Sequence, residues 1–223
     1  MGQLSRPVPT LHQEDKLHLS TLLISPQFDP GFACKPLAER PTSKKRYGRV
    51  RQGLIPGDIF RFTRLRWEVS SKEIGSGLKW VPMMKGGEFR RYFSNENWLF
   101  LWQKSGVEPK AFAEQRYGGA SRTIKNESEF FKPGITFPRV SSVGMNGRLM
   151  PQDSVFSDTG MAIIPEEEAS TWNLLALFNS RLADIICAAL HPGRKFEVAH
   201  LAAIPIEERV LTDEGLRTLA REA

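Results

Sequence analysis

Basic and aromatic residues surround a pair of glycines near the middle of this chain, in the run Lys85-Gly86-Gly87-Glu88-Phe89-Arg90-Arg91-Tyr92-Phe93. Glycine lets a backbone approach a phosphate closely, arginine can hold a phosphate with two hydrogen bonds, and flat rings suit bases. The run therefore indicates a surface for a phosphate-bearing partner. A tight turn with exposed charge is the equally good alternative for an isolated motif. The candidate contacts are Lys79, Lys85, Gly86, Gly87, Arg90, Arg91 and Tyr92.

Two more segments downstream combine basic and polar side chains with turn residues. The candidate contacts in the second segment are Arg116, Arg122, Lys125 and Asn126, and those in the third are Arg139, Ser141, Asn146 and Arg148. Arginine and asparagine are the side chains that read guanine and adenine edges in the major groove. Asn146-Gly147 fits a two-residue hairpin turn between Val143 and Leu149. Three such segments on one strand scaffold would form a set of groove-reading loops.

A metal site is the main alternative chemistry. Cys187 and His191 lie four residues apart, which places them on one helical face, and His200 follows. No fourth ligand is evident, and a single cysteine on an apolar helix usually belongs to the core. We therefore expect no metal site. Walker A, His-Glu-x-x-His and Gly-x-Ser-x-Gly patterns are absent, so no catalytic residue is assigned.

Composition agrees with a polyanionic partner. The chain has 223 residues, and 31 Lys and Arg against 25 Asp and Glu give a formal net charge of +6. Cys34 and Cys187 are isolated from each other, and the N-terminus has no apolar signal sequence. The longest apolar run, Ile185 to Leu190, is too short to span a bilayer. These features predict a cytoplasmic protein without a membrane partner.

The chain divides into three regions and predicts an α+β fold, in which a strand-and-turn-rich recognition region is followed by C-terminal helices. Residues 1–57 are proline-rich and basic, and include the run Lys44–Arg51, which is either a solvated loop or a phosphate-contacting arm. Residues 58–165 are rich in strand and turn signals, and residues 166–223 are helical in pattern and expected to pack on them.

Several elements can be placed more closely. Trp98 to Trp102 is bulky throughout, as in a buried strand, and Ile59 to Val69 fits one bent or two short strands. Pro133-Gly134 fits a type II turn, and Pro109 to Gln115 fits a helix. A longer helix is expected from Glu166 to Pro192, with its acidic start at the positive end of the helix dipole.

Taken in order, these landmarks resemble the target-recognition domain of type IIG restriction-modification enzymes and of the adenine-specific methyltransferases of BREX phage defence. Gly53 to Phe62 resembles the segment that joins the catalytic core of these enzymes to the recognition domain, although Pro56 stands where threonine is usual. Type I specificity subunits are also similar to this chain, at Phe178-Asn179-Ser180 and at Ile204-Pro205-Ile206. The other matching landmarks are Trp67-Glu68-Val69, Lys85–Phe93, Trp98–Trp102, Phe131–Phe137 with Ser141-Ser142, Phe156-Ser157, Phe178-Asn179-Ser180 and Phe196–Ile206, which ends in Ile204-Pro205-Ile206.

The resemblance carries functional implications. In such enzymes an upstream core binds S-adenosylmethionine and methylates adenine N6 after base flipping, while the recognition domain reads the DNA sequence. The Asn-Pro-Pro-aromatic tetrad of that core is absent here. The resemblance thus implies a non-catalytic module for double-stranded DNA, without a cofactor of its own, that acts with a methyltransferase core in trans. The alternative is an interaction subunit or truncated remnant that docks a methyltransferase without reading DNA.

Overall fold

The computed structural model describes residues 34–36, 47–87, 90–94, 97–142, 144–190 and 195–222, and only the backbone of 34–36 and of Leu190. Its sheets and helices confirm the predicted α+β class. The strands are β1 (Cys34–Pro36), β2 (Gly48–Arg51), β3 (Thr63–Leu65), β4 (Trp80–Met84), β5 (Trp98–Leu101), β6 (Gly134–Pro138), β7 (Arg148–Met150), β8 (Val155–Phe156), β9 (Gly160–Pro165) and β10 (Pro205–Glu207). The α-helices are α2 (Ile59–Phe62), α3 (Gln103–Tyr117), α4 (Thr171–Phe178), α5 (Arg181–Leu190), α6 (Val198–Ala202), α7 (Glu208–Thr212) and α8 (Glu214–Glu222). Short 3-10 turns are η1 (Arg66–Glu68), η2 (Ser71–Glu73), η3 (Ala120–Arg122), η4 (Glu127–Glu129) and η5 (Glu168–Ser170).

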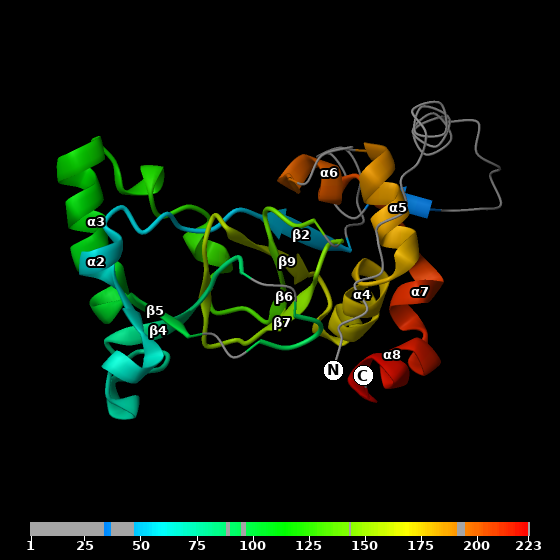
Figure 1. The fold of residues 1–223 in the computed structure, drawn as a ribbon, viewed down its shortest axis with the longest axis horizontal. Coiled ribbons are helices and arrows are strands. Elements are labelled where there is room, and N and C mark those ends of the chain that lie inside the picture. The colour runs from blue at the N-terminus through cyan, green and yellow to red at the C-terminus, as the bar shows by residue number, and fades with distance from the viewer. Residues whose placement is uncertain are drawn as a thin grey trace.

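A four-stranded antiparallel sheet, in the order β2-β9-β6-β7, occupies the centre of the molecule (Figure 1). Successive residues of a strand face opposite sides of the sheet. On β9, Met161 and Ile163 accordingly belong to one apolar core, shared with α4 and α5, and Ala162 and Ile164 belong to the other. Strand β9 is thus buried on both faces and joins the two halves of the fold.

The second sheet has the order β3-β5-β4-β8, with β4 and β8 parallel and the other pairs antiparallel. Leu99 and Phe100 of β5 are fully buried, which confirms the strand predicted at Trp98–Trp102. Helix α3 confirms the predicted helix at Pro109–Gln115 and extends it, although Lys104–Gly106 within it have left-handed dihedral angles. Pro109 lies near the start of the regular part, where its missing N–H costs nothing.

The C-terminal helices gather at the opposite end of the molecule from α2 and α3 (Figure 1). The single helix predicted from Glu166 to Pro192 is wrong, because the chain breaks between α4 and α5 at Asn179 and Ser180. The Asn179 side chain donates to the carbonyl of Gly147, 2.9 Å away, and accepts from its N–H at 3.0 Å. These tertiary hydrogen bonds hold Asn179 at the point where α4 ends, so the helix does not continue into α5.

Three turn and strand predictions also need correction. Ile59 begins helix α2 rather than a strand, because the Asp58 carboxylate accepts from the Arg61 N–H at 3.0 Å and caps the helix. Gly134 lies in β6, paired with Met150, and not in a type II turn.

The hairpin predicted at Asn146-Gly147 is not formed either. Strand β7 pairs with β6 across the loop of residues 139–147, and Val143 lies outside the described residues. Asn146 nevertheless has the positive φ, 54°, that such a turn would need.

The predicted N-terminal region is tied to the remainder by backbone pairing. Strand β2 pairs with β9, and β1 pairs with β10 near the C-terminal end. Most of residues 1–46, including Lys44 and Lys45, lie outside the described residues. Within the described ranges, no helix has the length and apolar character needed to cross a membrane.

Candidate nucleic-acid interface

The first basic segment leaves the second sheet directly after β4, and Lys85 lies at its base. The Lys85 ammonium is 3.8 Å from the ring centroid of Trp98, a favourable cation–π distance. Burial lowers the pKa of Lys85, and the nearby charge of Asp158 acts in the opposite direction. Lys85 therefore anchors the segment through an aromatic contact.

The two glycines differ in their surroundings. A Cβ on Gly86 would lie 2.5 Å from the carbonyl oxygen of Thr159, and the Gly86 N–H points at the Thr159 hydroxyl, 3.4 Å away. A Cβ on Gly87 would meet nothing within 4 Å, and this residue is exposed. Gly86 is thus required for packing against the loop before β9, whereas Gly87 leaves room for an approaching partner.

The third basic segment supports the first. The buried Asn146 side chain accepts from the Arg90 N–H through Oδ1 at 2.9 Å. Arg148 is 3% exposed and donates from Nη2 to the Lys85 carbonyl at 3.0 Å. In this arrangement Asn146 and Arg148 position the backbone of the first segment, and the Arg90 side chain is exposed and forms no ion pair with any described residue.

The residues after Arg90 connect this segment to the C-terminal helices. The Arg91 guanidinium lies 3.8 Å from the Asp184 carboxylate on α5. Burial raises the pKa of Asp184, and a hydrogen bond from the Met145 N–H and the Arg91 charge oppose that rise. The Tyr92 carbonyl accepts from the Leu149 N–H at 2.9 Å, and its half-buried ring packs on the core.

Arg139 and Ser141 lie on the loop between β6 and β7. Arg139 is part of an ion-pair group, because its Nη2 is 3.1 Å from the Glu197 carboxylate, which Lys195 also contacts at 3.1 Å. Hydrogen bonds from Lys195 and Arg139 lower the pKa of Glu197. Ser141 is half-buried.

The second basic segment lies apart from the other two. Arg116 lies in the last turn of α3 and Arg122 lies in η3, and both are exposed. Lys125 is half-buried, and the Asn126 amide donates to the Gln52 carbonyl at 2.8 Å. Helix α3 and helix α5, which Arg91 faces, are at opposite ends of the longest axis (Figure 1).

Lys79 also lies away from the Arg90 segment. It precedes β4, is exposed, and holds its Nζ 6.0 Å from the Trp80 ring centroid. The structure therefore brings the first and third segments together from Lys85 onward and leaves Lys79 and the second segment elsewhere.

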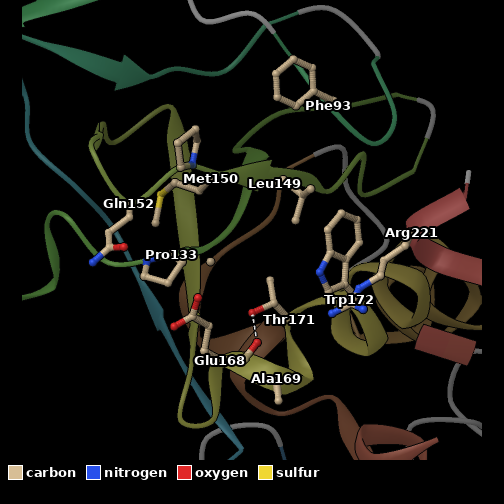
Figure 2. A pocket seen from close by; sticks show the side chains of 12 residues that line it. Phe93, Pro133, Leu149, Met150, Gln152, Glu168, Ala169, Thr171, Trp172 and Arg221 are labelled. Carbon is tan, nitrogen blue, oxygen red and sulfur yellow. Dashed lines mark hydrogen bonds between the residues drawn. The ribbon is translucent and has the colours of Figure 1, made fainter. Parts of the chain in front are cut away.

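A pocket of about 540 Å³ beside Phe93 was missed by sequence reasoning. Figure 2 shows Phe93 and Trp172 on different sides of Leu149, with the Arg221 side chain beside Trp172. The Arg221 guanidinium is 5.8 Å from the Trp172 ring centroid. Trp172 lies in the segment for which the sequence predicted only a helix, from Glu166 to Pro192. Phe93 is the last residue of the basic and aromatic run Lys85–Phe93, and it was the sequence feature that could have pointed to this pocket. The remaining lining residues are Pro133, Gly134, Met150, Pro151, Gln152, Glu168, Ala169 and Thr171.

Arg49, from the basic run near the N-terminus, is held inside the fold. It pairs with Glu129 at 2.9 Å and with Glu166, so within the described residues it acts as a structural link rather than an exposed arm. Hydrogen bonding to Glu166 raises the pKa of Arg49 most strongly, against the effect of burial.

Among the described residues, no three His, Cys, Asp or Glu side chains are grouped so that they could hold a metal ion. His191 lies outside the described residues. Cys187 is buried, and burial raises the pKa of its thiol to about 12, so it is protonated at neutral pH.

Comparison with known proteins supports the predicted relationship. No protein-family model matches the chain. It is 30% identical over 174 residues to the adenine-specific methyltransferase BrxX of Escherichia coli O9:H4 (strain HS). It is 22% identical over 169 residues to the adenine-specific methyltransferase PglX of Lacticaseibacillus casei (strain Zhang).

These matches cover 75% and 72% of this chain but only 13% and 14% of the two relatives. The chain therefore corresponds to a small part of long adenine-specific methyltransferases.

Proposed function

We propose that this chain reads double-stranded DNA as the recognition unit of an adenine-specific (N6) methyltransferase in a restriction-modification or phage-defence system. It acts with an S-adenosylmethionine-binding catalytic core in trans and transfers no methyl group alone. The exposed Arg90 on a backbone held by the buried Asn146 carries the proposal. The backbone that carries the guanidinium is thus in place before binding, which removes part of the entropy cost, and a guanidinium suits a phosphate or a guanine edge.

The surroundings of Arg90 fit this role. Gly87 leaves open space beside the segment, and Arg91 adds a second, partly exposed guanidinium. The formal net charge of +6 favours a polyanion. The similarity to adenine-specific methyltransferases supplies the reaction that such recognition would serve.

Duplex binding and methyl transfer by the full chain test the proposal directly. Fluorescence anisotropy should detect binding to labelled duplexes, with affinity falling by a slope of about −0.9 per phosphate contact against the logarithm of salt concentration. Incubation with tritiated S-adenosylmethionine should leave the DNA unlabelled. Failure to bind duplex at low salt, or methylation by the purified chain alone, would contradict the proposal.

A second candidate is an interaction subunit that docks a methyltransferase without reading DNA. The observation in its favour is the exposure of Phe60 at 91% and of Trp67 at 70%, because exposed aromatic side chains commonly anchor protein interfaces. A pull-down distinguishes the two candidates. Under this candidate the methyltransferase is retained at high salt, and no duplex is bound at low salt.

A further inference from the structure

Large apolar side chains are exposed where helices α2 and α3 meet the solvent. Ile59 is 48% exposed, Phe60 91%, Val107 59% and Tyr117 40%. These four residues define what we call the α2–α3 face. Exposed apolar patches mark interaction surfaces in folded proteins, and these four residues lie on two helices that contact each other.

The two helices are joined rigidly. The Arg61 guanidinium is 2.9 Å from the Glu108 carboxylate on α3, and its centre is 5.6 Å from the Phe112 ring centroid. The Phe62 and Phe112 rings pack edge to face with centroids 5.2 Å apart. The face is therefore fixed before a partner arrives, which reduces the entropy lost on docking.

Phe60 itself stands on a well-supported backbone. Its carbonyl accepts from Nη1 of Arg64 at 2.6 Å, and the carboxylate of Asp58 caps the helix that carries it. A rigid aromatic side chain with its ring in solvent is the usual form of an interface anchor. Nothing in the described residues covers this ring, since it is 91% exposed.

Arginines and carboxylates both lie around the face, and Arg66 is a cation there without an ion pair among the described residues. Arg61, Arg64 and Arg66 lie within six residues of Phe60. Three carboxylates lie nearby: Glu108 pairs with Arg61, Asp58 accepts from the Arg61 N–H and Glu68 accepts from the Leu65 N–H. An apolar hollow with a carboxylate opposite Arg66 would complement this arrangement.

The position of the face leaves the Arg90 segment free. Helices α2 and α3 form one end of the molecule, and α5, which Arg91 contacts, lies towards the other (Figure 1). The relatives are far longer than this chain, which covers 13% and 14% of their lengths. In such proteins a unit of this kind must adjoin a large remainder.

We propose that the α2–α3 face is the surface on which the methyltransferase core docks, with Phe60 inserted into an apolar hollow of the core. The choice of partner rests on the proposed function, whereas the surface itself rests on exposure and geometry. Stacking of Phe60 on DNA and association of two copies of the chain are outcomes that the experiment separates.

Site-specific photo-crosslinking tests the proposal. In the full, tagged chain, p-benzoylphenylalanine replaces Phe60 or, as a matched control, Leu219, which is 67% exposed on α8. Irradiation in cells that carry the native genes, followed by denaturing purification and mass spectrometry, identifies what each position touches. We expect the Phe60 position, and not the Leu219 position, to crosslink to a peptide of an adenine-specific methyltransferase core.

The alanine variants give a quantitative readout. Phe60→Ala should lower the methyltransferase recovered with the tagged chain about tenfold or more, while Leu219→Ala lowers it less than about twofold. Both variants should keep the wild-type melting temperature, because neither side chain is buried. Crosslinks to DNA, to a second copy or to an unrelated protein would overturn the proposal, as would equal loss in the two variants.

Duplex binding by the same variants separates this inference from the proposed function. If Phe60→Ala binds duplex as the wild type does and loses the core, both proposals stand. If the wild-type chain binds duplex but crosslinks to no core, the docking surface is wrong and DNA recognition survives. If it binds no duplex yet crosslinks to a core through position 60, the docking proposal stands and DNA recognition is wrong.

Discussion

The backbone N–H of Arg90 donates a 2.9 Å hydrogen bond to Oδ1 of Asn146, 56 residues later in the chain. Asn146 is fully buried and Arg90 is exposed, so an interior side chain sets the position of a surface one. The third basic segment thus holds the first in place. The residues predicted to contact DNA therefore have two different roles. Some, such as Asn146, hold the backbone in place, and others, such as Arg90, present an exposed cation.

Asn146→Ala should destabilise the fold, because it leaves the Arg90 N–H without its acceptor and places alanine at a φ of 54°. We expect a loss of about 1–3 kcal/mol in the free energy of unfolding, measured by urea denaturation. The matched control is Gln115→Ala on the exposed surface of α3, which should change stability by less than about 0.5 kcal/mol. Equal stability of the two variants would show that Asn146 does not hold this segment.

Arg90→Ala and Arg91→Ala should weaken binding to all duplexes to a similar degree, because phosphate contacts carry no sequence information. Each should reduce the magnitude of the salt slope by about 1, measured by anisotropy over a salt series. Arg209→Ala on α7, whose side chain is 73% exposed, is the control and should leave the slope unchanged. An unchanged salt slope in the Arg90 variant would show that Arg90 contacts no phosphate, and the proposed function would lose the observation that carries it.

The adjacent glycines offer a matched pair of substitutions. Gly86→Ala would place a methyl group 2.5 Å from the Thr159 carbonyl oxygen, whereas Gly87→Ala meets nothing within 4 Å. We expect Gly86→Ala to cost about 1–3 kcal/mol of stability and Gly87→Ala less than about 0.5 kcal/mol. Thermal unfolding of the two proteins checks this. If only the Gly87 variant lost DNA affinity while remaining folded, close approach of a phosphate there would gain direct support.

Stability should fall in acid through Glu129. Burial acts to raise the pKa of this carboxyl, but hydrogen bonds and charges from Lys132 and Arg49 outweigh it and lower the pKa below its ordinary value. A lowered folded pKa gives stability above the unfolded pKa that is lost as pH falls through the folded pKa. The free energy of unfolding should therefore decrease as the pH falls from the ordinary glutamate pKa of 4.5 through the lower folded pKa, and Glu129→Gln should flatten that decrease. Glu167→Gln, an exposed control, should keep the wild-type profile.

Local signals predicted the elements that depend on local sequence. The bulky run at Trp98–Leu101 forms a buried strand because all four of its own side chains are apolar, and Leu99, Phe100 and Leu101 are buried in the core. The helix break at Asn179 could not be predicted, because its cause is a pair of hydrogen bonds to Gly147, 32 residues away. A pattern of helical spacing contains no information about such a partner.

For the candidate site, the sequence predicted which segment carries the exposed cation but not which of the predicted residues are buried. Basic and aromatic residue types identified the segment around Arg90, and the exposed arginine is there. The burial of Arg148 was not foreseeable, because it depends on the Lys85 carbonyl that Arg148 reaches across the fold. The separation of Arg122 from Arg90 likewise depends on tertiary contacts that no single segment encodes, because η3 contacts α3 whereas Arg90 is hydrogen-bonded to Asn146.

That separation leads to a test of which basic segments touch DNA together. Arg122 is exposed in η3, which contacts α3, and α3 lies at the end of the molecule away from α5 (Figure 1). If Arg122 reads a base, Arg122→Ala should relax preference at one base pair by about 1–3 kcal/mol, measured by competition between duplexes of different sequence. Ser121→Ala, its exposed neighbour, is the control. Because Arg122 and Arg90 share no contacts, the double variant should lose the sum of the two single effects within about 0.5 kcal/mol. Loss in the Arg90 variant with none in the Arg122 variant would confine the DNA surface to the segment that Asn146 supports.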